Sequence, residues 1–135
     1  MDNCIFCKII RGEVPAAKIW EDENFLAFET VMAINPGHTL IIPKKHIDYL
    51  FDLDDQTLAQ LMVASKPIAK AIAKAFRPKT GRVGMMIAGM GVPHAHVHLV
   101  PMNAERDLDF SKAKEISMEV RQANAERIKV TLNPE

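Results

Sequence analysis

Short apolar runs separated by turn signals predict most of the β-structure. Residues 17–22 and 25–30 are two such runs, and the Glu-Asp-Glu-Asn stretch at 21–24 between them indicates a hairpin turn. A third run, 39–42, follows Asn35-Pro36-Gly37 and stops at Pro43, where the ladder would lose a donor. Residues 81–89 and 94–101 return to extended, apolar character. We therefore expect five strands.

Helical spacing appears in three other places. Near the N-terminus, Ile5, Ile9 and Ile10 favour a short amphipathic turn that Gly12 and Pro15 would end. Asp54 is a candidate N-cap for a long helix, which Pro67 should kink or divide. Its expected buried face comprises Leu58, Leu61, Met62, Ser65, Ile68, Ile72 and Phe76. A last helix is predicted with Ile116, Val120 and Ala123 on one face.

Strand neighbours joined by short turns, with one long helical excursion, predict an α+β fold. The sheet should be mostly antiparallel, with helices on one face, a long helix after the third strand and a C-terminal helix. The chain has 135 residues, of which 48% are hydrophobic, enough for one core. We expect a single domain over 1–135, in which the polar residues 103–135 form a C-terminal extension.

Charge and hydropathy exclude two classes of partner. The 17 basic and 17 acidic residues balance, and no basic run is long enough to bind nucleic acid through its phosphates. No stretch of about 18 apolar residues predicts a membrane span, and the N-terminal sequence does not resemble a secretory signal. We expect a soluble, cytoplasmic protein.

Three of the five histidines, His94, His96 and His98, occupy alternate positions. On a strand they would share one face, while Ala95 and Val97 point into the core. In regular strand geometry the outer two would lie about 13 Å apart, too far to bind one ion together with the middle one.

Three interpretations of this face remain. It could be a solvated edge strand that happens to be rich in imidazole. His94 and His96 could bind a catalytic zinc together with a third histidine and a water molecule. Alternatively, a neutral imidazole could attack phosphorus and form a labile phospho-histidine, while neighbouring imidazoles and free backbone N–H groups bind the phosphate oxygens.

The only two cysteines, Cys4 and Cys7, form a C-x-x-C pair. This spacing is typical of half a tetrahedral zinc site, although two packed thiols would also satisfy it. The pair does not follow a strand, as a thioredoxin-like redox pair would.

The sequence HAHVHLVP at 94–101 resembles the signature of the histidine triad family of nucleotide hydrolases and transferases. Residues 4–28 and 35–46 resemble the N-terminal segment and the central strand of that family. The resemblance implies an α+β fold with a five-stranded antiparallel sheet, and a symmetric homodimer in which two sheets form one of ten strands. It also implies that the ligand is a nucleotide or a nucleotide conjugate.

The resemblance implies cleavage at the α-phosphate of a nucleoside phosphoramidate or a dinucleoside polyphosphate, with release of a nucleoside monophosphate. Matched by position, His96 is the nucleophile, and His98 and His38 contact the phosphate or orient the nucleophile. A nucleotide sensor without catalysis and a zinc hydrolase that uses His94 and His96 are the competing functions.

The same resemblance assigns nucleotide-binding positions, although simple core packing would also explain the apolar ones. Thr30 stands where many members have an aspartate for the ribose hydroxyls, and Met90 stands where glutamine is usual. These departures put substrate choice and rate in question. The expected nucleotide-binding set is Ile5, Phe6, Ile9, Phe28, Thr30, Leu40, Gly89 and Gly91.

A subset of the family binds structural zinc through such a cysteine pair and two histidines. The matching set here is Cys4, Cys7, His46 and His94, which predicts one zinc per chain. All five histidines then have a role, with His94 assigned to the metal and His96, His98 and His38 to the phosphate.

Overall fold

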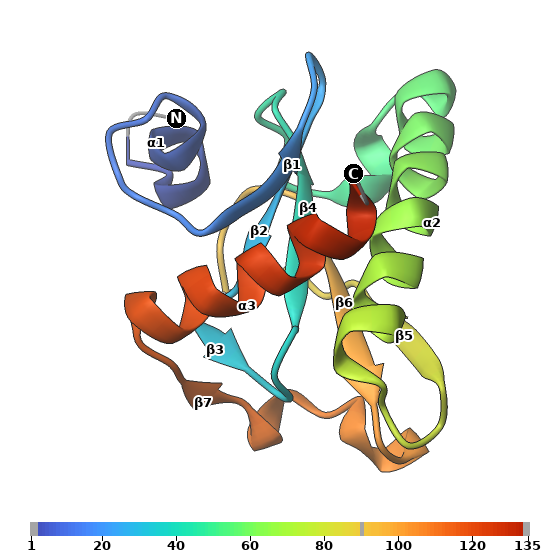
Figure 1. The fold of residues 1–135 in the computed structure, drawn as a ribbon. Helices are drawn as coiled ribbons and strands as arrows, with labels where there is room; N and C mark the ends of the chain where they lie inside the picture. The colour runs from blue at the N-terminus through green and yellow to red at the C-terminus, as the bar shows by residue number, and fades with distance from the viewer. Residues whose placement is uncertain (1–2, 90, 134–135) are drawn as a thin grey trace.

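The computed structural model describes residues 3–89 and 91–133, which form three helices and two sheets (Figure 1). The helices are α1 (Ile5–Ile10), α2 (Asp55–Phe76) and α3 (Met118–Leu132). The strands are β1 (Lys18–Glu21), β2 (Phe25–Glu29), β3 (Met32–Ala33), β4 (Thr39–Pro43), β5 (Arg82–Met86), β6 (Val97–Met102) and β7 (Lys114–Glu115).

The main sheet has five antiparallel strands in the order β1-β2-β4-β6-β5, which confirms the predicted fold class. The predicted hairpin joins β1 to β2, and the Asp22 carboxylate accepts the N–H groups of Asn24 and Phe25 in its turn. The short strands β3 and β7 pair separately and connect the chain after β2 to the segment before α3.

The sheet is covered on both faces, whereas helices on one face were expected. Alternate residues of β2 and β4 face opposite cores. Ala27 and Ile41 belong to the larger core that α2 and α3 cover. Phe28 and Leu40 belong to a smaller core that α1 covers from the other side (Figure 1). The predicted N-terminal turn is therefore a structural layer.

Helix α2 begins at the predicted N-cap, where the Asp54 carboxylate accepts the Thr57 N–H at 3.1 Å. It runs through Pro67 without dividing. Pro67 and Val63 are exposed, so water can satisfy the carbonyl that the missing proline N–H leaves free. The buried face is largely as predicted, but Met62 is 53% exposed. No helix in the described ranges is both long and apolar enough to cross a membrane.

Helix α3 lies across the sheet beside α2, with a buried face that differs from the predicted one. Asn124, Ala125 and Ile128 are buried, whereas Val120 is exposed and Ile116 precedes the helix. Contacts with α2 and β1 set this face. Its apolar residues are Met118, Ala125, Ile128 and Leu132, and the polar Arg121 and Asn124 interrupt them in the sequence. The Arg127 guanidinium lies 4.2 Å from the Phe76 ring centroid, which fastens α3 to the end of α2.

A glutamic acid, Glu29, is 1% exposed beneath the helices, and burial raises its pKa to about 8. The Thr39 hydroxyl lies 2.6 Å from Glu29 Oε2 and 2.9 Å from the Gly37 carbonyl. A hydroxyl has only one proton to donate. A protonated Glu29 supplies a second proton, so both contacts can be hydrogen bonds.

We predict that Glu29→Gln removes a pH dependence of stability. Between the ordinary pKa of 4.5 and about 8, folded Glu29 keeps a proton that the unfolded chain loses. Its contribution to stability is therefore complete below pH 4.5 and falls as pH rises, by up to about 1.4 kcal/mol per unit. Urea unfolding at pH 5, 6.5 and 8 should show that the free energy of unfolding of the variant rises relative to that of the wild type as pH increases. A difference in free energy of unfolding that stays constant with pH would contradict this. Glu23→Gln, at an exposed position, is the matched control.

Candidate active site and metal centre

The three clustered histidines lie where the chain enters β6, and not within one strand as predicted. Only His98 belongs to the strand, which begins at Val97. Further upstream, the Ala95 N–H binds the Ile47 carbonyl, and the Pro43 carbonyl of β4 contacts the His94 ring at 2.8 Å. The backbone ladder to β4 therefore stops before His96. Ala95, Val97 and Leu99 do face the large core, as the alternation predicted.

His38 and His98 form a directed hydrogen-bonded row. The Ile34 N–H donates to His38 Nδ1 at 3.0 Å, so the proton of neutral His38 resides on Nε2. This nitrogen lies 2.9 Å from His98 Nδ1 and donates to it. His98 must then carry its own proton on Nε2. The row thus ends in an N–H donor.

His96 has the opposite polarity. Its Nδ1 lies 2.7 Å from the His94 carbonyl, which can only accept, so Nδ1 carries the proton. Nε2 of neutral His96 therefore has a free lone pair. The His96 ring lies between those of Phe6 and His98, with centroid separations of 5.2 and 5.1 Å. A nucleophilic nitrogen and an N–H donor thus occur on neighbouring rings.

Burial keeps two of these histidines neutral. It lowers the pKa of His38 to about 4. Burial, followed by the neighbouring His38 and His96, lowers the pKa of His98 to about 3. Both rings are neutral near pH 7, which is the state that the hydrogen-bonded row requires.

The sequence reasoning missed Phe110, which lies on the outer side of this row. It comes from a short 3₁₀ turn in the C-terminal segment, and its ring centroid is 4.7 Å from that of His98. Phe110 shields His98 although it is itself 42% exposed. A lone aromatic residue in a polar stretch was the only signal in the sequence.

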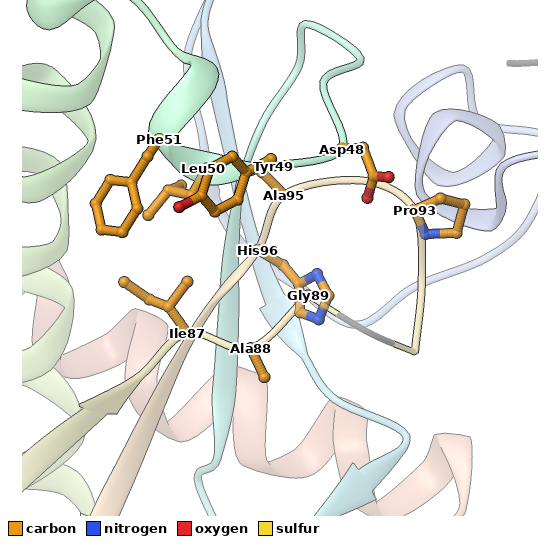
Figure 2. A pocket seen from close by; sticks show the side chains of 10 residues that line it. All are labelled: Asp48, Tyr49, Leu50, Phe51, Ile87, Ala88, Gly89, Pro93, Ala95 and His96. Carbon is orange, nitrogen blue, oxygen red and sulfur yellow. The ribbon is translucent and has the colours of Figure 1, made fainter.

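A cavity of about 640 Å³ opens beside His96 (Figure 2). Gly89 lies on its wall with a φ of +79°, and the exposed rings of Tyr49 and Phe51 border it. Gly91 is not among the lining residues, and Met90 lies outside the described residues. Of the two glycines expected to bind nucleotide, only Gly89 shares a cavity with His96.

A second cavity, of about 460 Å³, lies between α1 and β2 and brings the rest of the expected nucleotide-binding set together. We call it the nucleoside cavity, after the ligand that the resemblance to the histidine triad family implies. Phe6 and Phe28 meet edge to face there, with centroids 5.6 Å apart. The sequence reasoning missed Val92, Met118 and Arg121, which also line it. The expected members that line it are Ile5, Phe6, Ile9, Phe28, Thr30 and Leu40.

The four predicted metal ligands form one cluster, in which all ligand atoms lie within 4.8 Å of one another. His94 Nδ1 lies 3.4 Å from Cys4 Sγ and 3.6 Å from Cys7 Sγ, and His46 Nδ1 lies 3.2 Å from Cys7 Sγ. Tetrahedral zinc with ordinary bond lengths places sulfur and nitrogen ligands about 3.6 Å apart. The donor set and its spacing therefore fit zinc.

Helix α1 and β4 orient these ligands. Cys4 is the N-cap of α1, and its sulfur accepts the Cys7 N–H at 3.4 Å, which directs both thiols to one side. The Pro43 carbonyl can only accept, so His94 carries its proton on Nε2 and turns a free Nδ1 toward the sulfurs. Burial, followed by hydrogen bonding to Cys4, raises the pKa of the Cys7 thiol.

The competing metal site at His94 and His96 has no support in the geometry. His94 Nδ1 faces the cysteines, whereas His96 Nδ1 is bound to a carbonyl. Across residues 3–89 and 91–133, no other cluster of three or more potential ligands occurs. His94 therefore belongs to the cysteine-histidine cluster, which includes neither His96 nor His98.

Comparison with known proteins places the site in context. A model of the HIT domain, named for the histidine triad, matches residues 11–105. The Bacillus subtilis protein named Protein hit is 41% identical over 109 residues, which cover 78% of this chain and 75% of that protein. The Saccharomyces cerevisiae adenosine 5'-monophosphoramidase HNT1 is 42% identical over 106 residues, which cover 76% of this chain and 65% of that protein.

Solved structures agree over nearly the whole chain. A HIT-like protein from Bartonella henselae, described as involved in cell-cycle regulation, superposes with a TM-score of 0.85 and 33% identity, covering 97% of each chain. A Zn-bound histidine triad family protein from Mycobacterium smegmatis superposes with a TM-score of 0.83 and 29% identity, covering 98% of this chain and 95% of the other.

Proposed function

Because the chain belongs to the HIT domain family, we propose that it hydrolyses nucleoside phosphoramidates or dinucleoside polyphosphates at the α-phosphate through a nucleotidyl-His96 intermediate. The observation that carries this proposal is the opposite polarity of two adjacent rings, the free Nε2 of His96 and the N–H of His98. The name of the yeast relative, adenosine 5'-monophosphoramidase, supports the phosphoramidate class.

The proposed reaction has two displacements at phosphorus. His96 Nε2 attacks the α-phosphorus, and the bond to the leaving amine or phosphate breaks, with its electron pair going to the leaving group. An amine takes a proton from water as it departs. His98 donates its N–H to a phosphate oxygen, and His38 holds His98 in that tautomer. A water molecule then attacks phosphorus and gives up a proton to solvent, and the electron pair of the P–N bond returns to His96 Nε2. A nucleoside monophosphate is released and the neutral ring is restored.

The nucleoside cavity would hold the base against the edge-to-face pair formed by Phe6 and Phe28. Phe6 also contacts the His96 ring, so the cavity borders the proposed nucleophile. Ile5, Ile9 and Leu40 would supply apolar contacts, and Thr30 would lie beside the sugar. Gly89 would approach the leaving group from the cavity in Figure 2. Gly91 remains an expectation from the resemblance.

We predict that His96→Ala lowers turnover of adenosine phosphoramidates by about 10³-fold or more, because a nucleophile is lost. Binding of the monophosphate product should persist, since the nucleoside cavity is unchanged. Added imidazole should restore part of the turnover in His96→Gly. In the wild type, acid-free quenching and mass spectrometry should find the nucleotidyl adduct on His96.

An unaffected rate in His96→Ala would rule the mechanism out. Tight nucleotide binding by the wild type, without release of monophosphate from any phosphoramidate or dinucleoside polyphosphate, would instead favour a nucleotide sensor. Circular dichroism and zinc content of each variant show whether a lost rate reflects a lost fold.

We further propose that Cys4, Cys7, His46 and His94 bind one structural zinc per chain, with no position left open for water. When bound, zinc holds the thiolates and ties α1 to the strands. The two free thiols also suit the reducing conditions of the cytoplasm, where we place the protein.

Metal analysis of protein purified without added metal should find one zinc per chain in the wild type and in His96→Ala. Cys4→Ser should lose the metal and unfold at lower temperature, because two thiolates are needed to hold α1 on the sheet. Substoichiometric zinc with both thiols freely titratable would contradict this assignment.

We also propose that two copies join through β5 into a ten-stranded sheet. β5 is an edge strand, and an exposed edge tends to pair. Met62 and Ile87 line one small cavity with Met85 of β5, and both are at least 40% exposed. A copy seated on β5 would cover these side chains.

Light scattering at micromolar concentration should therefore give twice the chain mass of 15.1 kDa. Met62→Lys should shift the protein toward the monomer, because it buries a charge in the interface. The control Val120→Lys alters an exposed apolar residue on α3 and should leave the mass unchanged. A wild-type monomer at all concentrations would contradict the proposal.

A further inference from the structure

The nucleoside cavity contains one available charge, from the C-terminal helix. Arg121 and Glu29 are its only ionisable lining residues among those described. Glu29 is 1% exposed and its carboxyl contacts the Thr39 hydroxyl, so it offers the ligand no charge. Arg121 therefore sets the polarity of an otherwise apolar cavity.

Arg121 has most of its hydrogen-bonding capacity free. Its Nε–H donates to the Ser117 carbonyl at 3.4 Å, one turn back along the helix. Within the described part of the chain, no carboxylate forms an ion pair with it. A guanidinium has five N–H donors in a planar fork that matches phosphate. The remaining donors can bind an anionic ligand.

The start of α3 is fastened to the wall of the cavity where a sugar would lie. The Ile116 N–H donates to the Val31 carbonyl at 3.0 Å, and the helix begins two residues later at Met118, which also lines the cavity. Two residues after the lining residue Met32, the Ile34 N–H donates to His38 Nδ1. The segment from Thr30 to Ile34 thus runs from the aromatic rings proposed to bind the base to the histidine row proposed to bind the phosphate. A ribose would have to span the same interval.

Apart from the buried Glu29, this wall presents no carboxylate to a ribose diol. The Thr30 hydroxyl donates to the Met32 carbonyl of its own segment at 3.3 Å. In dinucleotide-binding folds, a carboxylate binds the free ribose hydroxyl, whereas a nearby arginine accommodates a phosphate at the same place, and the same chemistry applies here. We propose that Arg121 selects nucleotides that carry an additional phosphate on the 2′ or 3′ oxygen of the ribose. This proposal rests on the nucleoside cavity named above.

Calorimetry with 5′-AMP, adenosine 2′,5′-bisphosphate and adenosine 3′,5′-bisphosphate tests it on the intact protein. At least one bisphosphate should bind about tenfold or more tightly than 5′-AMP, because it adds a charge-assisted bidentate contact. Arg121→Gln should abolish that preference, because it lowers the affinity for the bisphosphate far more than the affinity for 5′-AMP. Arg121→Lys should keep part of it. Lys70→Gln, which removes one positive charge from α2, should leave the preference intact.

Equal binding of all three nucleotides by the wild type would overturn the proposal. So would a preference that survives in Arg121→Gln, or an equal loss of affinity for all three ligands, which would place Arg121 on the base or the 5′-phosphate. The test is independent of catalysis. If the His96 adduct is absent but the bisphosphate preference is found, the hydrolase mechanism fails and the specificity stands. Turnover without the preference would support the hydrolase mechanism and overturn the specificity.

Discussion

The contacts of His94 connect the cluster of proposed zinc ligands to the proposed nucleophile, His96. Its ring is bound through Nε2 to the Pro43 carbonyl and faces the cysteines through Nδ1. Its own carbonyl accepts the proton of His96 Nδ1, which leaves the opposite nitrogen of His96 free. One residue therefore orients the cluster of proposed zinc ligands and sets the tautomer of the proposed nucleophile. The opposite polarity of His96 and His98 depends on this carbonyl, because a neutral imidazole carries its proton on only one ring nitrogen.

Burial fixes the protonation state of three ionisable groups, His38, His98 and Glu29. His38 and His98 remain neutral because a charge on either would be poorly solvated. Glu29 keeps its proton for the same reason and forms a hydrogen-bonded pair with Thr39. These groups give the site directional hydrogen bonds without a net charge. In such surroundings, the half-buried Arg121 supplies the dominant charge for a ligand in the nucleoside cavity.

The C-terminal segment contributes side chains to the His38–His98 row and to the nucleoside cavity. Phe110 covers the outer side of His98, and Met118 and Arg121 close the nucleoside cavity. Helix α3 is held for this task by the pairing of β3 with β7 and by the contact of Arg127 with Phe76. The match to the HIT domain spans residues 11–105, so these three side chains lie outside it.

The sequence alone determined the fold class, the five strands and the hairpin, because hydrophobic alternation and turn residues are local signals. It also identified the histidines and cysteines, since their chemistry and spacing are visible along the chain. It misjudged the covering of the sheet, the buried face of α3, the burial of Met62, the start of β6 and the effect of Pro67. These features depend on contacts between distant segments. Only the tertiary structure placed Phe110 on His98 and Arg121 in the nucleoside cavity, and only it showed which nitrogen of each imidazole is free. That choice depends on a carbonyl or N–H supplied by another part of the backbone, and no pattern of residue types records where that group will lie.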